Sequence, residues 1–180
     1  ETACALGFKP SIAAAFDIDS AAVSVYRNNF KAQNHRVMAC DLGTVLLGTV
    51  GREPRKSERE LVKRIGRVDV LLAGPPCQGH SDLNNHTRRN DDRNRLYLRA
   101  VRFAELFRPS IVIIENVRAV THDRIGVVRT SEEIFEKLGY VVQKLVVNAN
   151  ELGLPQLRKR HVLLATMKPL PDFRPVKNGE

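Results

Sequence analysis

An apolar run that ends at two prolines and is followed by a cysteine constrains the fold more than any other feature of this sequence. Residues 68–72 are valines and leucines around one aspartate, and they predict a buried strand. Pro75 and Pro76 must end that strand, because proline cannot donate a hydrogen bond to a sheet. Cys77 therefore lies just past the carboxyl end of a strand, which is the edge where open α/β sheets bind ligands. A thiol at that place is a candidate nucleophile, although most free cysteines are only small buried apolar residues.

Short apolar runs alternate with amphipathic segments along the rest of the chain. We expect strands over residues 11–16, 36–39, 68–74, 111–114, 140–147 and 161–166, and helices over 20–30, from about 57, over 96–107 and over 131–138. Ser20 is expected to cap the first helix, and Ser131 to begin the last. This alternation predicts one α/β domain, and 180 residues suffice for a single core.

Acidic side chains follow two of the predicted strands near the start of the chain. In doubly wound nucleotide-binding sheets, a carboxylate at the end of the second strand accepts hydrogen bonds from ribose hydroxyls, and Asp17 is placed for this role. Asp41 follows the next strand and could meet an adenine amino group. Asp17, or Asp19 beside it, could instead cap the next helix, and Asp41 could be a turn residue.

A third acid and two arginines follow later strands. Glu115 comes directly after four β-branched residues, and it lies beside Cys77 if the two strands are parallel neighbours. Its carboxyl would then be partly desolvated and could hold a proton for a ring nitrogen. A helix cap or an ion pair is the alternative for Glu115. Arg158 and Arg160 are two residues apart at the start of a strand, so they could clamp a phosphate or a carbonyl oxygen from one side, unless they are only a solvated basic pair.

The charge of the chain favours an anionic partner. Lysine and arginine total 29 against 20 acids, which gives a formal net charge of +9 and suits nucleic acid. Residues 78–94 contain almost no apolar side chain and predict a polar loop whose arginines could meet phosphates, with disorder as the alternative.

The chain has three cysteines, Cys4, Cys40 and Cys77. Because they are odd in number and far apart in the sequence, they predict free thiols in a reducing compartment. Cys77 with His80 and His86 matches no structural zinc pattern, so we expect no metal. No apolar run approaches the roughly 18 residues that a membrane-spanning helix needs.

Three motifs, taken together and in this order, resemble the cytosine carbon-5 DNA methyltransferases. They are Pro75-Pro76-Cys77-Gln78-Gly79-His80-Ser81, Glu115-Asn116-Val117 and Gln156-x-Arg158-x-Arg160. Supporting matches are Asp17-Ile18-Asp19 with the following Tyr26 to Phe30, Asp41-Leu42, and Asp92-Arg93-Asn94-x-Leu96. The resemblance covers nearly the whole chain. It implies a Rossmann-like fold that depends on S-adenosylmethionine, with a mostly parallel sheet truncated at both ends.

The resemblance also implies roles for individual residues. Cys77 would add as a thiolate to carbon 6 of a cytosine turned out of the duplex, after which carbon 5 takes a methyl group from S-adenosylmethionine. Glu115 would hydrogen-bond the ring, Arg160 would meet the base carbonyl, and Arg158 would orient the site near Cys77. The cofactor-binding residues would be Asp17, Ile18, Asp41, Leu42, Pro76 and Leu96.

The wider context implied is double-stranded DNA as partner, a possible cognate restriction endonuclease, a monomer, and a bacterial or phage-like protein in the cytoplasm or at the nucleoid. The family's opening strand with its Phe-x-Gly-x-Gly turn, its target-recognition region and its closing asparagine-bearing segment have no counterpart here. We therefore expect residues 1–167 to be a catalytic domain without its first strand and glycine-rich turn, and residues 168–180 to be a linker towards the recognition region.

We expect this chain alone not to methylate DNA. A methyltransferase acting on transfer RNA, and a non-catalytic nucleic-acid-binding module on the same fold, stay open as alternatives.

Overall fold

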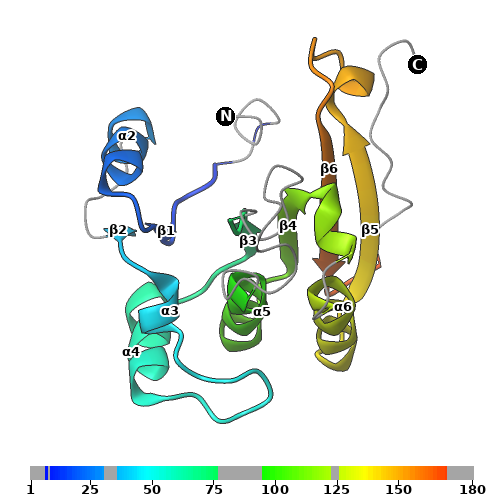
Figure 1. Cartoon of the computed structure of the whole chain (residues 1–180). Coiled ribbons are helices and arrows are strands. Elements are labelled where there is room, and N and C mark those ends of the chain that lie inside the picture. The colour runs from blue at the N-terminus through cyan, green and yellow to red at the C-terminus, as the bar shows by residue number, and fades with distance from the viewer. Residues whose placement is uncertain (1–6, 8, 31–35, 77–94, 123–125, 170–180) are drawn as a thin grey trace, which may run out of the picture. The chain divides into compact units, whose positions relative to one another are not determined.

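The computed structural model describes residues 7, 9–30, 36–76, 95–122 and 126–169, which belong to two compact units (Figure 1). The first unit comprises Glu1–Leu47 and Pro54–Arg67, and the second comprises Gly48–Glu53 and Val68–Glu180. The second unit thus includes a short segment that lies in the sequence between the two parts of the first. Each unit is described below by itself.

The described residues of the first unit form two parallel strands and three helices. They are β1 (Ala15–Asp17), α2 (Ser20–Phe30), β2 (Val37–Ala39), α3 (Leu42–Val45) and α4 (Lys56–Ile65). β1 and β2 pair from Ala15 opposite Val37 to Asp17 opposite Ala39. The predicted helix over residues 20–30 is confirmed, whereas β1 forms only at the end of the predicted strand over 11–16.

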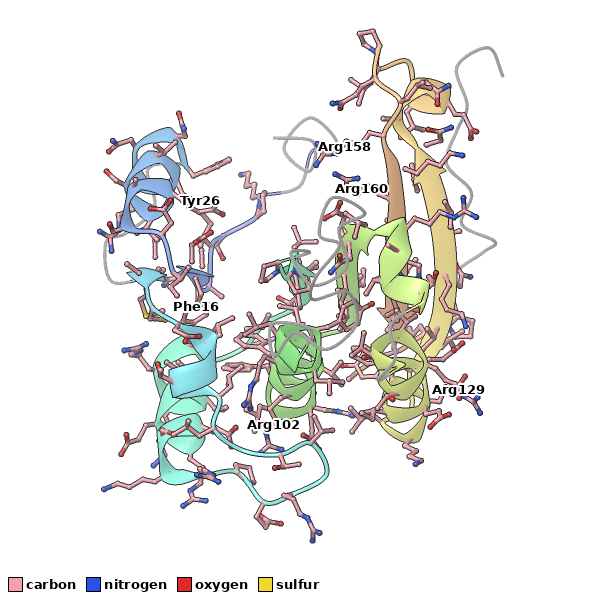
Figure 2. All side chains as sticks on the ribbon, viewed as in Figure 1. Phe16, Tyr26, Arg102, Arg129, Arg158 and Arg160 are labelled. Carbon is pink, nitrogen blue, oxygen red and sulfur yellow. The ribbon has the colours of Figure 1, made fainter. Side chains whose placement is uncertain are left out.

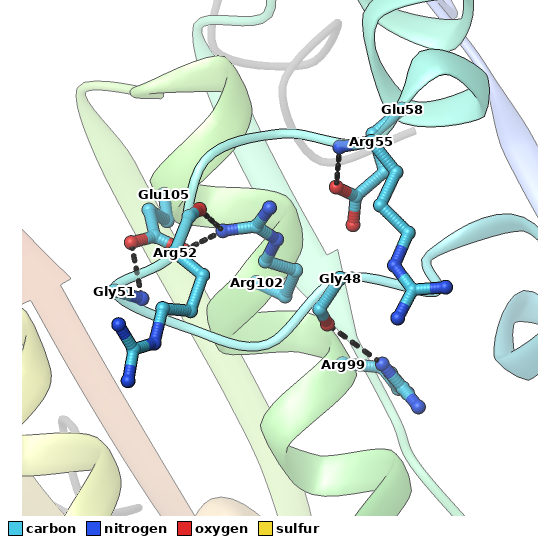
Figure 3. Close-up of polar contacts among 8 residues, drawn as sticks. All are labelled: Gly48, Gly51, Arg52, Arg55, Glu58, Arg99, Arg102 and Glu105. Carbon is cyan, nitrogen blue, oxygen red and sulfur yellow. Dashed lines mark hydrogen bonds and ion pairs between the residues drawn. The ribbon is translucent and has the colours of Figure 1, made fainter.

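The N-termini of α2 and α4 are closed by acidic side chains. Ser20 was predicted to cap α2, but this is wrong, because Asp19 Oδ1 accepts the hydrogen bond from the Ala21 N–H at 2.8 Å. At α4, the side chain of the buried Glu58, in the first turn of the helix, accepts a hydrogen bond from the Arg55 N–H at 2.9 Å (Figure 3). Both contacts satisfy N–H groups that a helix cannot pair internally.

The second unit is built on a four-stranded sheet in the order β3-β4-β6-β5. The strands are β3 (Val70–Ala73), β4 (Ile111–Val117), β5 (Val141–Asn148) and β6 (Lys159–Thr166). β3 and β4 are parallel, and β6 is antiparallel to both β4 and β5. Because β3, β4 and β5 run in one direction, the mostly parallel sheet of an α/β fold is confirmed.

Helices α5 (Arg95–Phe107) and α6 (Val127–Lys137) pack with this sheet, and the short 3-10 helices η3 (Arg118–His122) and η4 (Ala149–Leu152) join its strands. Alternate residues of β4 are buried, so one face of that strand contributes Val112 and Ile114 to the core. Burying each such side chain stabilises the fold by about 1.5–3 kcal/mol.

The start of α6 differs from the prediction. Ser131 was expected to begin this helix, but α6 begins at Val127. Ser131 lies one turn inside, fully buried, and its hydroxyl donates to the Val127 carbonyl at 2.6 Å. A serine that bonds back to the preceding turn gives the same sequence signal as a cap, which explains the error.

Residues 48–53 are fastened to α5 by a buried arginine (Figure 3). Arg102 is 1% exposed and donates to the Arg52 carbonyl at 2.9 Å and to Glu105 Oε2 at 2.5 Å. Glu105 in turn accepts from the Gly51 N–H at 2.8 Å. The guanidinium and the carboxylate therefore satisfy main-chain groups of a segment without regular structure.

Candidate active site

Glu115 lies over the carboxyl end of β3, as the parallel arrangement predicted. The last paired residues of the two strands are Ala73 and Ile114, so Gly74 and Glu115 come next in register. A Cβ atom placed on Gly74 would lie 3.9 Å from Glu115 Oε2. Cys77, with His80, His86 and the rest of the segment 77–94, lies outside the described residues, so its distance from Glu115 stays a prediction.

Glu115 forms an ion pair with Arg160. Arg160 Nε lies 2.7 Å from Glu115 Oε1, and their side chains are 25% and 47% exposed respectively. Glu115 is opposite Val162 across β4 and β6, and Arg160 is two residues from Val162, so both side chains share one face of the sheet. The ion pair left open by the sequence is therefore formed, and it joins two of the predicted catalytic residues.

The expected desolvation of Glu115 is not provided by the described residues, because nearly half of the side chain is exposed. An ion pair this open adds at most about 1 kcal/mol to stability. Its main effect is to hold a carboxylate and a guanidinium against the same volume at the sheet edge.

Arg158 immediately precedes β6, which begins at Lys159. Its carbonyl accepts from the Ala149 N–H at 2.9 Å, and its side chain is exposed. Figure 2 shows Arg158 and Arg160 at the same end of the β5–β6 pair. Arg160 Nη1 donates to the Lys159 carbonyl at 2.9 Å, which further fixes this guanidinium.

Asn116 was missed as a site residue by the sequence reasoning. It is 2% exposed, and its Nδ2 donates to the Pro75 carbonyl at 3.2 Å. The sequence did hold a signal for it. Asn116 is a polar residue that alternates in step with the core residues Val112 and Ile114, so it is expected on the buried face of β4.

The first unit brings the two predicted cofactor carboxylates to adjacent strand ends. Asp17 ends β1, and Asp41 follows β2 with only Cys40 between them. The Cys40 N–H donates to the Asp17 carbonyl at 2.8 Å, which ties the two strand ends together. Parallel strands thus place both carboxylates at one edge of the first unit's sheet.

Both carboxylates also shape the local backbone. Asp17 Oδ1 accepts from the Asp19 N–H at 2.9 Å, and Asp41 Oδ1 accepts from the Gly43 N–H at 2.7 Å as the N-cap of α3. The capping alternative is therefore correct for Asp19, whereas Asp41, for which a turn residue was the alternative, is a helix cap. Each carboxylate has lone pairs beyond these bonds and is exposed, so it fits a pair of ribose hydroxyls or an amino group.

The remaining cofactor candidates belong to both units. Ile18 is 74% exposed and Leu42 is half-buried in the first unit, while Pro76 is exposed and Leu96 half-buried in the second. Exposed apolar side chains next to carboxylates suit a ligand with an aromatic ring and a polar sugar.

Two further side chains have shifted pKa values, Cys40 after β2 in the first unit and His161 on β6 in the second. Burial raises the pKa of the Cys40 thiol, so Cys40 is held in its less nucleophilic protonated form. His161, on β6 opposite Asn116, is 2% exposed, and burial with the nearby Lys144 ammonium lowers its pKa. Its imidazole is therefore neutral at neutral pH.

Within the ranges given above for the described chain, no three histidine, cysteine, aspartate or glutamate side chains gather as metal ligands. None of the helices placed by the structure is long and apolar enough to cross a bilayer.

Comparison with known proteins gives consistent matches. The sequence matches the family described as C-5 cytosine-specific DNA methylase over residues 4–179. It is 38% identical over 176 residues to type II methyltransferase M1.BsuMI of Bacillus subtilis (strain 168), which covers 98% of this chain and 41% of that protein. It is 38% identical over 144 residues to type II methyltransferase M1.HphI of Haemophilus parahaemolyticus, covering 77% of this chain and 35% of that protein. The chain thus spans less than half the length of these relatives.

Solved structures support the fold. The methyltransferase EhMeth of Entamoeba histolytica superimposes with a TM-score of 0.68 at 20% identity, covering 93% of this chain and 48% of that one. The Dnmt2 methyltransferase of S. pombe gives a TM-score of 0.68 at 17% identity, covering 95% and 48%. The described elements are thus part of a Rossmann-like methyltransferase fold.

Proposed function

Because the chain belongs to the family of C-5 cytosine-specific DNA methylases, we propose that it is the part of an enzyme that transfers a methyl group to carbon 5 of cytosine in DNA. The observation that carries this proposal is the match over residues 4–179 together with the Glu115–Arg160 pair beside the end of β3. Pro75 and Pro76 lead from that end directly to Cys77 in the sequence.

The proposed reaction begins with the Cys77 thiolate. Its sulfur forms a bond to carbon 6 of a flipped cytosine, and the electron pair of the ring double bond becomes available at carbon 5. Glu115 hydrogen-bonds the ring on its nitrogen edge and stabilises the charge that develops there. Arg160, already held by Glu115 through Nε, directs its other N–H groups towards the base carbonyl.

S-adenosylmethionine, which methyltransferases of this family use, would supply the methyl group to carbon 5 when it is bound and would leave as the neutral thioether S-adenosylhomocysteine. Carbon 5 then gives up its proton to a base. The electron pair of that carbon–hydrogen bond restores the ring double bond, and the pair of the carbon–sulfur bond returns to the Cys77 sulfur. No step needs a metal. Arg158, which is exposed and immediately precedes β6, orients the site near Cys77.

For the cofactor we propose that Asp17 accepts the ribose hydroxyls and Asp41 the adenine amino group. Both are exposed carboxylates at adjacent strand ends. As apolar cofactor-binding residues we propose Ile18 and Leu42 of the first unit and, each in its own place in the second unit, Pro76 and Leu96. For the whole protein we propose double-stranded DNA as substrate, a cognate restriction endonuclease as functional partner, and a monomer.

Covalent trapping tests this proposal in the protein that carries this chain. A DNA duplex with 5-fluorocytosine cannot lose its substituent at carbon 5, so the enzyme should remain bonded to it through denaturing electrophoresis when S-adenosylmethionine is present. Cys77→Ala should form no adduct. Glu115→Gln should form it at least tenfold more slowly, because a catalytic proton holder contributes about 10²–10⁴-fold.

The same assay separates the alternatives. Trapping by a 5-fluorocytosine RNA and not by the DNA would replace DNA methylation with RNA methylation. DNA binding without any adduct, unaffected by Cys77→Ala, would point to a non-catalytic module.

A further inference from the structure

Asn116 is a buried amide whose orientation is fixed at both ends. Its Nδ2 donates to the Pro75 carbonyl at 3.2 Å, and its Oδ1 accepts from the Val117 N–H at 2.8 Å. A carbonyl can only accept and an N–H can only donate, so this arrangement admits a single orientation of the amide. The side chain is 2% exposed, so water does not compete for either bond.

The bond to Pro75 replaces contacts that a sheet cannot make here. The recorded β3–β4 pairing ends with Ala73 opposite Ile114. Pro75 and Pro76 have no N–H, so the chain beyond Gly74 cannot continue an ordinary ladder. Asn116, two residues past Ile114, reaches the carbonyl two residues past Ala73, and its side chain thus prolongs the register of the two strands.

Glu115 and Asn116 act on the two sides of this strand end. Successive residues of a strand point to opposite faces, and accordingly Glu115 is exposed beside Arg160 while Asn116 is buried. The two neighbouring side chains lie at Gly74 and Pro75, the residues through which the chain leaves β3.

We propose that Asn116 is a positioning residue, which fixes the path from β3 to Cys77 relative to the Glu115–Arg160 pair. This inference rests on the proposed function and adds a residue to its machinery. Asn116 is buried on the face opposite Glu115, and it acts through the Pro75 carbonyl, two residues before Cys77 in the sequence. Because a displacement of about 1 Å at a reacting group can cost on the order of 100-fold in rate, one such bond is enough to control the reaction.

The test uses the whole protein and compares three variants. Asn116→Ala removes both bonds. Asn116→Ser keeps a hydroxyl near the Val117 N–H but is too short to reach Pro75. Ser131→Ala is the matched control, because Ser131 is also buried and also donates to a main-chain carbonyl, but within α6.

The readouts are the single-turnover rate of methyl transfer, the rate of adduct formation with 5-fluorocytosine DNA, KM for DNA and Tm. We expect both Asn116 variants to react about 100-fold more slowly with KM within about threefold of the parent. Ser131→Ala, which leaves the Val127 carbonyl with its helical hydrogen bond, should lower Tm by no more than Asn116→Ala does and keep its rate within about twofold.

Rates of the Asn116 variants within twofold of the parent would overturn the inference, and so would losses that Ser131→Ala shows equally. If Asn116→Ala does not fold, Asn116→Ser alone decides the question by the same criteria. An adduct in the parent protein with unaffected Asn116 variants overturns only this inference, whereas no adduct in the parent overturns the proposed function with it.

Discussion

Two buried tyrosines should respond oppositely to loss of their hydroxyl groups. Tyr97, on α5, is 1% exposed, and its hydroxyl has no hydrogen-bond partner within the described ranges. Tyr140 is 3% exposed, and its hydroxyl donates to the Pro109 carbonyl at 2.7 Å. Burial raises the pKa of both, so both phenols are neutral at neutral pH. Replacement by phenylalanine keeps each ring and removes one oxygen atom.

The expected magnitudes follow from the two environments. Tyr140→Phe removes a net hydrogen bond and leaves the Pro109 carbonyl without that donor, which should lower the free energy of unfolding by about 1–3 kcal/mol. Tyr97→Phe removes a buried hydroxyl that no group of the described residues compensates by a hydrogen bond, so the free energy of unfolding should stay the same or rise by about 1 kcal/mol. Phe135 meets the Tyr140 ring edge-on with centroids 5.5 Å apart, and a phenylalanine at position 140 keeps this ring contact.

Urea unfolding followed by circular dichroism measures both changes against the parent chain. The slope of the free energy with urea should be the same in all three proteins, so a shift in midpoint reports stability. Equal losses in the two variants, or a larger loss for Tyr97→Phe, would refute the reasoning, since the hydroxyl of Tyr97 would then have a stabilising partner.

Three further predictions concern stability. Arg102→Met should lower the free energy of unfolding by about 1.5–3 kcal/mol, because the Arg52 carbonyl and Glu105, whose side chain is 17% exposed, lose a charged donor. Arg129→Met, at a side chain that is 85% exposed, should change it by less than about 1 kcal/mol in the same urea titration. The pKa of His161 is lower in the folded than in the unfolded chain, so the free energy of unfolding should fall as pH drops below about 6.5, by up to about 1.4 kcal/mol per pH unit. In His161→Leu, the slope of the free energy of unfolding against pH should be shallower by that amount. Gly66→Ala should lower Tm at a cost of about 1–2 kcal/mol, because Gly66 has φ of 74° and open space around its Cβ position, so strain alone acts; an unchanged Tm would contradict this.

The sequence predicted elements whose signal is local. The helix over 20–30 follows from apolar spacing and is in the structure. The sequence also predicted strands before Pro75 and before Glu115, and the condition set for Glu115, that these two strands are parallel neighbours, is met by β3 and β4.

Contacts between distant side chains were less accessible. Arg160 was expected to face a base, and its pairing with Glu115 depends on the antiparallel register of β4 and β6, which periodicity does not fix. Asn116 was passed over although its position along β4 matches in parity that of the core residues Val112 and Ile114, because parity predicts burial and not a partner. Its role depends on Pro75, 41 positions earlier in the sequence.

Residues 48–53 have a consequence for dissecting the protein. They belong to the second unit, yet they precede α4 of the first, so the boundary between the units in space is not a single boundary in the gene. A piece expressed from Val68 onward would lack the main-chain groups of residues 51 and 52 that bond to Arg102 and Glu105. The Arg102 guanidinium and the Glu105 carboxylate would then lose these partners. A second unit expressed by itself should therefore keep residues 48–53, joined to Val68 by a linker in place of residues 54–67.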